Sequence, residues 1–125
     1  MKKIISTSDA PKAIGPYSQA VETNGILFIS GQIPIDPVTG KFVEGGITEQ
    51  TEQVMKNIGA ILKRAGFEYK DVVKSTCLLS DMENFAAMNL VYGKYYPENP
   101  PARAAYAVVR LPLGALVEIE TIACR

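Results

Sequence analysis

The sequence feature that most restricts the fold is Asn24-Gly25, which separates two short runs of strand-forming residues, 18–22 and 26–30. Asn and Gly accept the positive φ angles that a type I′ turn requires at both of its central positions, and this turn joins adjacent antiparallel strands. The sequence therefore predicts a β-hairpin here, and the fold must contain an antiparallel sheet.

Two later segments are predicted to be helices. In the first, Thr48 can cap the start of the helix and Gly66 can end it. The second begins at the capping-box spacing of Ser80-Asp81-Met82-Glu83 and ends at Pro97. The residues expected to face the core are Val54, Ile58, Ile61, Leu62 and Ala65 in the first helix, and Phe85, Met88, Tyr92 and Tyr95 or Tyr96 in the second.

The remaining segments complete the prediction of a mixed sheet. Further strands are predicted at 2–6, 72–79, 103–109 and 116–124, whereas the prolines and glycines of 31–46 are typical of an irregular segment. The order of strands, helix, strand, helix and strands predicts an α+β fold, with two helices across one face of a six-stranded mixed sheet. We expect the last two strands to pair with each other as a hairpin.

Length and composition are those of one folded domain. The 125 residues are expected to form a single domain, 1–125, and 47% hydrophobic with 21% charged residues is typical of a globular protein. Thirteen basic and thirteen acidic residues cancel, so no overall field favours nucleic acid. No apolar segment is long enough for a signal sequence or a membrane span, so we expect no membrane partner and a cytoplasmic location.

The chain contains no histidine, which removes the commonest general base and metal ligand and excludes Ser-His and Cys-His nucleophile pairs. Cys77 and Cys124 lack the spacing of a zinc site and are expected to be reduced thiols, so no metal is predicted. Any chemistry must therefore come from carboxylates, arginine, hydroxyl groups and the backbone.

The segment 104–109 is apolar on both sides, so both faces of its strand are expected to be covered. The two helices cover one face of the sheet. The other face would be covered by self-association into a homo-oligomer, or by the irregular segment 31–46 folding over it.

Arg103 is the leading candidate for ligand binding, because it begins an apolar strand directly after Pro100-Pro101. A guanidinium stays charged, and burying it beside a strand is costly unless a carboxylate or phosphate neutralises it and accepts its hydrogen bonds. Either the protein or a ligand must supply that anion. Glu118 and Glu120 share one face of the final strand, so either could pair with Arg103 or lie across a pocket from it. The alternative is a salt bridge on a solvated face.

Four other residues are candidates only in combination. Tyr17 follows Gly15-Pro16 on a predicted loop, Ser30-Gly31 follows a hairpin strand, and Asn89 lies on the core stripe of the second helix, where its amide needs a partner. Taken alone, Tyr17 and Ser30-Gly31 fit packing or turn roles, and Asn89 fits a core hydrogen bond.

Together these segments resemble the reactive intermediate deaminase family, the RidA or YjgF-type imine deaminases. The resemblance covers 3–125 and rests on Gly15-Pro16-Tyr17-Ser18-Gln19, Ser30-Gly31-Gln32-Ile33-Pro34, the helix with Asn89, Pro101-Ala102-Arg103 and Val117-Glu118-Ile119-Glu120. It implies a chorismate-mutase-like α+β fold and a homotrimer, with a central barrel of sheets and sites between subunits. It also implies hydrolysis of 2-iminobutanoate and 2-iminopropanoate, formed from 2-aminocrotonate and 2-aminoacrylate, to 2-oxo acids and ammonia.

The same resemblance implies roles for the candidate residues. Arg103 would hold the substrate carboxylate, and Glu118 would position or activate water. The further pocket residues would be Tyr17, Ser30, Gly31 and Asn89. Many members carry cysteine at the position of Ala105, where only the backbone N–H can meet a ligand in this chain. No cofactor is implied, and the implied functional link is to PLP-dependent dehydratases.

Two other functions stay open at this point. An arginine pocket could bind a small carboxylate as a sensor or scaffold without turnover. Glu118 favours the hydrolase, because a pure carboxylate receptor gains nothing from a carboxylate beside its ligand. A ribonuclease or translation inhibitor, as reported for some relatives, is disfavoured by the balanced charge and the missing histidine.

Overall fold

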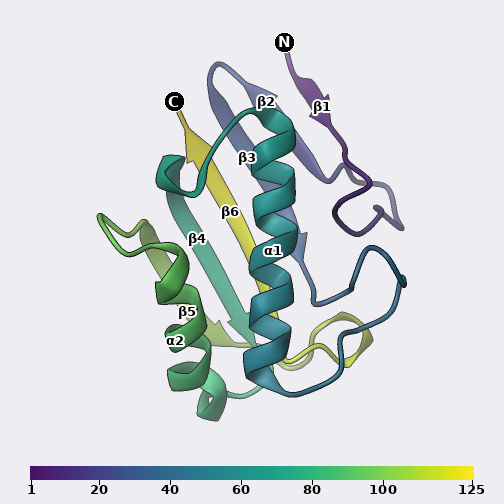
Figure 1. Ribbon diagram of the computed structural model, residues 1–125, viewed down its shortest axis with the longest axis vertical. Helices are drawn as coiled ribbons and strands as arrows, with labels where there is room; N and C mark the ends of the chain where they lie inside the picture. Colours follow the sequence, from purple (N-terminus) through teal and green to yellow (C-terminus); the bar gives the residue numbers. More distant parts are fainter.

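The computed structural model describes residues 1–125 and consists of one mixed sheet with two helices on the same face (Figure 1). The sheet has the order β1-β2-β3-β6-β4-β5, which confirms the predicted α+β architecture. The strands are β1 (Lys3–Ile5), β2 (Ala20–Thr23), β3 (Ile26–Gln32), β4 (Val72–Leu79), β5 (Ala102–Ala107) and β6 (Val117–Cys124), and the helices are α1 (Ile47–Ala65) and α2 (Phe85–Tyr95).

The pairing of the last two strands differs from the prediction. β5 runs parallel to β4, and β6 lies between β3 and β4, so β5 and β6 are not neighbours. The cause is α2, which carries the chain from the end of β4 back to the start of β5 as a crossover, and a crossover joins parallel strands. The predicted hairpin between the last two strands is therefore wrong.

The first hairpin forms as the sequence predicts. β2 and β3 pair antiparallel up to Thr23 and Ile26. Between them Asn24 has φ of 50° and Gly25 has φ of 77°, the left-handed values that a type I′ turn needs. A Cβ on Gly25 would also lie only 2.7 Å from the carbonyl oxygen of Arg125, so the turn packs closely against the end of the chain.

The start of α1 lies earlier than predicted. Gly46, not Thr48, precedes the first helical residue, and its N–H donates to Glu49 Oε1 at 2.8 Å. Glu49 satisfies this donor from inside the first turn, so a hydroxyl cap at position 48 is not needed. At the other end Gly66 takes the left-handed conformation and stops the helix, as predicted.

The start of α2 also differs in detail from the predicted capping box. Asp81, rather than Ser80, accepts a hydrogen bond from the N–H of Glu83 at 2.9 Å. A short 3₁₀ turn at Met82–Asn84 follows before α2 begins. The predicted capping site is therefore in the right segment, but Asp81 acts as the cap instead of Ser80.

The core lies between the helices and one face of the sheet. Each predicted core residue is buried except Ala65, Phe85 and Tyr95, which are partly buried against the cluster. The strands contribute Leu27, Cys77, Leu79, Val117 and Ile119, all fully buried. In neither helix is the apolar stretch sufficient to cross a lipid bilayer.

The other face of the sheet is open. Ile4, Phe28 and Tyr106 are 53%, 44% and 49% exposed, on three different strands. The irregular segment after β3 does not cover this face. Instead, the side-chain amide of Asn57 in α1 donates to the carbonyl oxygens of Ile33 (3.2 Å) and Ile35 (3.0 Å). These bonds hold the irregular segment on the helix side of the sheet. The alternative in which this segment covers the sheet is therefore wrong.

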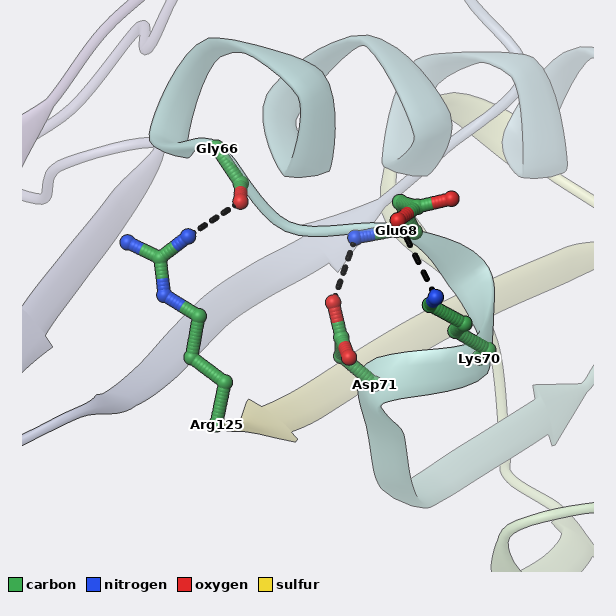
Figure 2. A network of polar contacts seen from close by, with 5 residues as sticks. All are labelled: Gly66, Glu68, Lys70, Asp71 and Arg125. Carbon is green, nitrogen blue, oxygen red and sulfur yellow. Dashed lines mark hydrogen bonds and ion pairs between the residues drawn. The ribbon is translucent and has the colours of Figure 1, made fainter.

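The connection from α1 to β4 is tied to the C-terminal residue (Figure 2). The Arg125 guanidinium donates to the carbonyl oxygen of Gly66 and lies 4.3 Å from the centre of the Phe67 ring. Within the turn, the N–H of Glu68 donates to Asp71 at 2.8 Å, and the Glu68 carboxylate pairs with Lys70 at 3.5 Å. These contacts fix the chain where it enters β4.

Gly59, in the interior of α1, provides a test of this packing. A Cβ at Gly59 would overlap the hydroxyl of Tyr69, which donates to the carbonyl oxygen of Met55 at 2.7 Å. Helix propensity alone favours alanine by about 0.5–1 kcal/mol. We nevertheless expect Gly59→Ala to lower the free energy of unfolding, measured by urea denaturation at fixed protein concentration.

The matched control is Gly93→Ala in α2, where a Cβ meets nothing within 4 Å. This control should raise the free energy of unfolding by about 0.5–1 kcal/mol. Stabilisation by Gly59→Ala of the same size would show that Tyr69 does not restrict this position.

Candidate active site

Arg103 lies at the start of β5 and faces α2. Its Nη1 donates to Asn89 Oδ1 at 2.6 Å, and its Cζ lies 5.1 Å and 5.4 Å from the ring centres of Tyr92 and Phe85. Neither of the two ion pairs in the structure includes this half-buried guanidinium. An amide oxygen and aromatic faces orient the cation without neutralising it, so donors remain for an anion.

The thiol nearest to Arg103 is not a plausible nucleophile. Cys77 pairs with Ala105 across the parallel strands and is fully buried. Burial raises the pKa of the Cys77 thiol to about 11, and Arg103 opposes this rise only in part. Because the thiolate is the reactive form, Cys77 is inert at neutral pH. Ala105 itself, half-buried, carries no reactive group.

Glu118 lies in a separate cavity of about 570 Å³ on the open side of the sheet. The cavity brings together four predicted residues from distant parts of the chain, namely Tyr17, Ser30, Gly31 and Glu118. Its other lining residues are Ile14, Ile33, Pro112, Leu113 and Glu120. A carboxylate beside apolar walls and a phenol could hold a water molecule against a small substrate.

A β-bulge shapes this cavity. Ile29 pairs with Thr121 and Gln32 pairs with Ile119, so two residues of β3, Ser30 and Gly31, lie opposite one residue of β6. Bulges of this kind bend a strand and are frequent beside active sites. The absence of a side chain at Gly31 is required, because a Cβ there would overlap the Glu118 carboxylate.

Ser30 is held by the loop that carries Tyr17. Its hydroxyl donates to the carbonyl oxygen of Ser18 at 2.6 Å, and its N–H donates to the carbonyl oxygen of Gln19 at 3.0 Å. The single hydroxyl proton is therefore committed, and Ser30 can meet a ligand as a hydrogen-bond acceptor. These bonds also place Tyr17, which is 50% exposed, at the mouth of the cavity.

The environment of Glu118 disfavours its charge. Burial raises the pKa of the Glu118 carboxyl above its ordinary value, and the nearby Glu120 carboxylate raises it further. Like charges on one strand face repel, and a partly desolvated carboxylate is more basic than one in water. Glu118 is thus better suited to accept and return a proton than an ordinary surface glutamate.

Arg103 and Glu118 lie on opposite faces of the sheet. Ser75 of β4 pairs with Arg103 on one side and with Thr121 on the other, so Arg103 is level with Thr121. Glu118 lies three residues from Thr121, and an odd separation turns a side chain to the other face. In addition, β4 lies between their strands, so the axes of β5 and β6 are roughly 10 Å apart. Within one chain they cannot pair or share a pocket, contrary to the sequence prediction.

Comparison with known proteins identifies the family. The family model described as Endoribonuclease L-PSP matches residues 7–125. A RutC family protein of Pyrococcus horikoshii is 56% identical over 123 residues, which covers 98% of each chain. The 2-iminobutanoate/2-iminopropanoate deaminase of Homo sapiens is 50% identical over 123 residues, covering 98% of this chain and 90% of that one. The chain belongs to the RidA/YjgF family.

Solved structures agree with this membership. RidA from the Antarctic bacterium Psychrobacter is 45% identical, with a TM-score of 0.95 over 98% of this chain and 99% of that one. E. coli TdcF with bound serine is 39% identical, with a TM-score of 0.94 over 98% of both chains. The family resemblance predicted from the motifs is therefore confirmed, and RidA proteins share the fold described above.

Sequence reasoning missed part of the surroundings of both candidate groups. Phe85 and Tyr92 were expected only to fill the core, but their rings also lie beside the guanidinium. Their spacing with Asn89 on one helix stripe was the available signal. Leu113 in the cavity wall had no such signal, because its place depends on a left-handed φ of 57° in the turn before β6.

The raised pKa of Glu118 predicts how stability depends on pH. A carboxyl whose pKa is higher in the folded state stabilises the fold below its unfolded pKa, and this stabilisation is lost as pH rises through the folded value. We therefore expect Glu118→Gln to raise the free energy of unfolding at pH 7, and the gain to disappear at acid pH. Urea denaturation at both pH values, with the exposed Glu44→Gln as control, tests this; a gain of equal size at both would contradict it.

Proposed function

We propose that this RidA-family chain hydrolyses 2-iminobutanoate and 2-iminopropanoate to 2-oxo acids and ammonia. The observation that carries the proposal is Arg103, a half-buried guanidinium that its own chain orients but does not neutralise. A 2-imino acid supplies the missing carboxylate beside the reacting carbon. We further propose that residues 1–125 form a single imine deaminase domain.

The names of the relatives support this substrate class. Proteins about half identical to this chain are named 2-iminobutanoate/2-iminopropanoate deaminase in Mus musculus and Homo sapiens, and the related E. coli TdcF was solved with bound serine. Serine is a small 2-amino acid, which shares its carboxylate and C2 nitrogen with the proposed substrates. Other relatives carry only the RutC family name.

The proposed mechanism uses the two groups for different tasks. Arg103 binds the substrate carboxylate with its remaining donors, while Asn89 keeps the guanidinium in place. Glu118 accepts a proton from water as this water attacks C2 of the protonated imine, and it returns this proton to the amino nitrogen of the resulting adduct. The C–N bond then breaks as the C2 hydroxyl becomes the carbonyl of the 2-oxo acid, and the hydroxyl proton passes to the departing ammonia. A positioned acid-base group contributes about 10²–10⁴ in rate, which suits a substrate that already hydrolyses spontaneously. Ser30, Gly31, Tyr17 and the Ala105 backbone would complete the pocket.

The opposite placement of the two groups supports sites between subunits. In a homotrimer, Arg103 of one chain can approach Glu118 of the next, whereas neither can do so alone. The exposed Phe28 and Tyr106 on the open face favour an assembly in which sheets pack together around a central barrel. Ligand binding and the covering of the apolar face would then depend on the same interface.

The expected context of the reaction stays a prediction. PLP-dependent dehydratases form enamines of the required kind, so they are the proposed source of substrate. A cytoplasmic location is proposed for this chain, although the relatives include a chloroplastic protein of Arabidopsis thaliana.

Variants of the two groups test the reaction. We expect the wild-type protein to accelerate pyruvate release from 2-aminoacrylate generated by a coupled dehydratase. Arg103→Ala should lose most of the rate, since the carboxylate anchor is gone, and Glu118→Gln should lose about 10²-fold or more. Exposed residues provide matched controls, Arg110→Ala and Glu44→Gln, and these should retain wild-type rates.

The outcome also separates catalysis from simple binding. A wild-type protein that binds small carboxylates but leaves the spontaneous rate unchanged would replace the hydrolase with a binding module. Full activity in Arg103→Ala would keep the reaction but remove the proposed anchor.

Mixing the two inactive variants tests whether sites form between chains. Coexpression of Arg103→Ala with Glu118→Gln should restore activity, because a chain that keeps Arg103 can meet a neighbour that keeps Glu118. Random mixing in a closed ring gives about a quarter of the sites both intact groups (½ × ½). Activity near a quarter of wild type in the purified mixed protein is expected. No restoration, with mixed assemblies confirmed by mass spectrometry, would place each site within one chain.

A further inference from the structure

A second large groove lies on the helix side of the sheet, away from Glu118. It has a volume of about 820 Å³ and runs between residues 6–9 and the surface of α1. Three hydroxyl residues line one side, and Lys56, Lys63 and Arg64 line the other. The volume is in the range of small-molecule sites, but the lining is polar rather than apolar. The geometry fits a charged ligand better than an apolar one.

The three cations of this groove have no carboxylate partner. The two ion pairs of the structure are Lys70 with Glu68 and Lys94 with Glu52, and neither involves a groove residue. A glutamate four residues before a lysine would stabilise the helix, but Gly59 and Ala60 occupy those positions before Lys63 and Arg64. Glu52 stands four residues before Lys56, but its carboxylate pairs with Lys94 at 3.3 Å instead. Asp9 is the single acidic residue in the lining, so positive charge prevails.

Helix stabilisation explains only part of this charge. Lys63 and Arg64 lie in the last turn of α1, where cations favour the helix dipole. Lys56 lies more than two turns before that end, outside the range of this effect. The Nε of Arg64 donates to the carbonyl oxygen of Ser6 at 3.0 Å, which fixes the guanidinium at the groove.

We propose that this groove binds a linear chain of two or three phosphates. Lys56 and Lys63 are seven residues apart on one helix face, which places them about 10 Å apart along the axis. One phosphate cannot contact both, whereas a short phosphate chain can extend between them. One end would lie at Lys63 and Arg64, beside the hydroxyl groups of residues 6–8, and the other at Lys56. Guanidinium and ammonium groups make strong charge-assisted hydrogen bonds with phosphate oxygens. This site is independent of imine hydrolysis.

Calorimetric titration of the full-length protein with inorganic triphosphate and inorganic monophosphate, at equal ionic strength, tests the proposal. We expect one triphosphate site per chain, with binding about tenfold tighter than that of monophosphate or better. Lys56→Gln should weaken triphosphate binding about tenfold and leave monophosphate binding unchanged, because only the longer ligand reaches Lys56. Lys41→Gln removes an exposed lysine outside the groove and should change neither affinity.

Several results would overturn the site. These are a triphosphate titration that does not saturate, equal affinities for both anions, or the same loss in Lys41→Gln as in Lys56→Gln. Thermal unfolding of each variant shows whether it is folded. For a Lys56→Gln protein that does not fold, Lys63→Gln replaces it and should weaken the binding of both anions.

Discussion

The arrangement of the candidate site depends on the packing of α2 against the first half of β5. Because α2 is the crossover between two parallel strands, the helix must lie over the edge of the sheet where Arg103 begins β5. Asn89 and the rings of Phe85 and Tyr92 therefore contact the guanidinium from the helix side of the sheet. Without this crossover helix, Arg103 would have neither an amide nor an aromatic face to orient it.

The Glu118 side of the site has a different physical origin. The shape of the cavity around Glu118 comes from the backbone, namely from the bulge at Ser30 and Gly31 and from the left-handed conformation of Leu113. The fold partly buries the Glu118 carboxyl over a bare glycine and close to Glu120. Burial, and to a lesser extent the Glu120 carboxylate, raise the pKa of Glu118 and make its ionised form costly. Such local costs are common where a group must act on a substrate, and the large core beneath the helices can offset them.

Local signals in the sequence predicted the elements well, while pairing between distant elements was predicted less well. Asn24-Gly25 and Gly66 act through their own backbone angles, so both were correct from sequence. The position of β6 in the centre of the sheet depends on which edge is free after the crossover, and no single residue encodes this. As a result, the prediction that Glu118 and Glu120 share one face of β6 was correct, but the prediction that this face also carries Arg103 was wrong.

The error in pairing is also informative about function. A direct hairpin would have let Arg103 and a glutamate neutralise each other within one chain, and the anion site would then be closed. With β4 between them, an odd number of residues along the strands turns the two side chains apart. Each chain thus keeps an unneutralised cation on one face and a basic carboxylate on the other. Under the proposed function, such a chain would need a second copy to complete its site, and its open apolar face offers a surface on which that copy can pack.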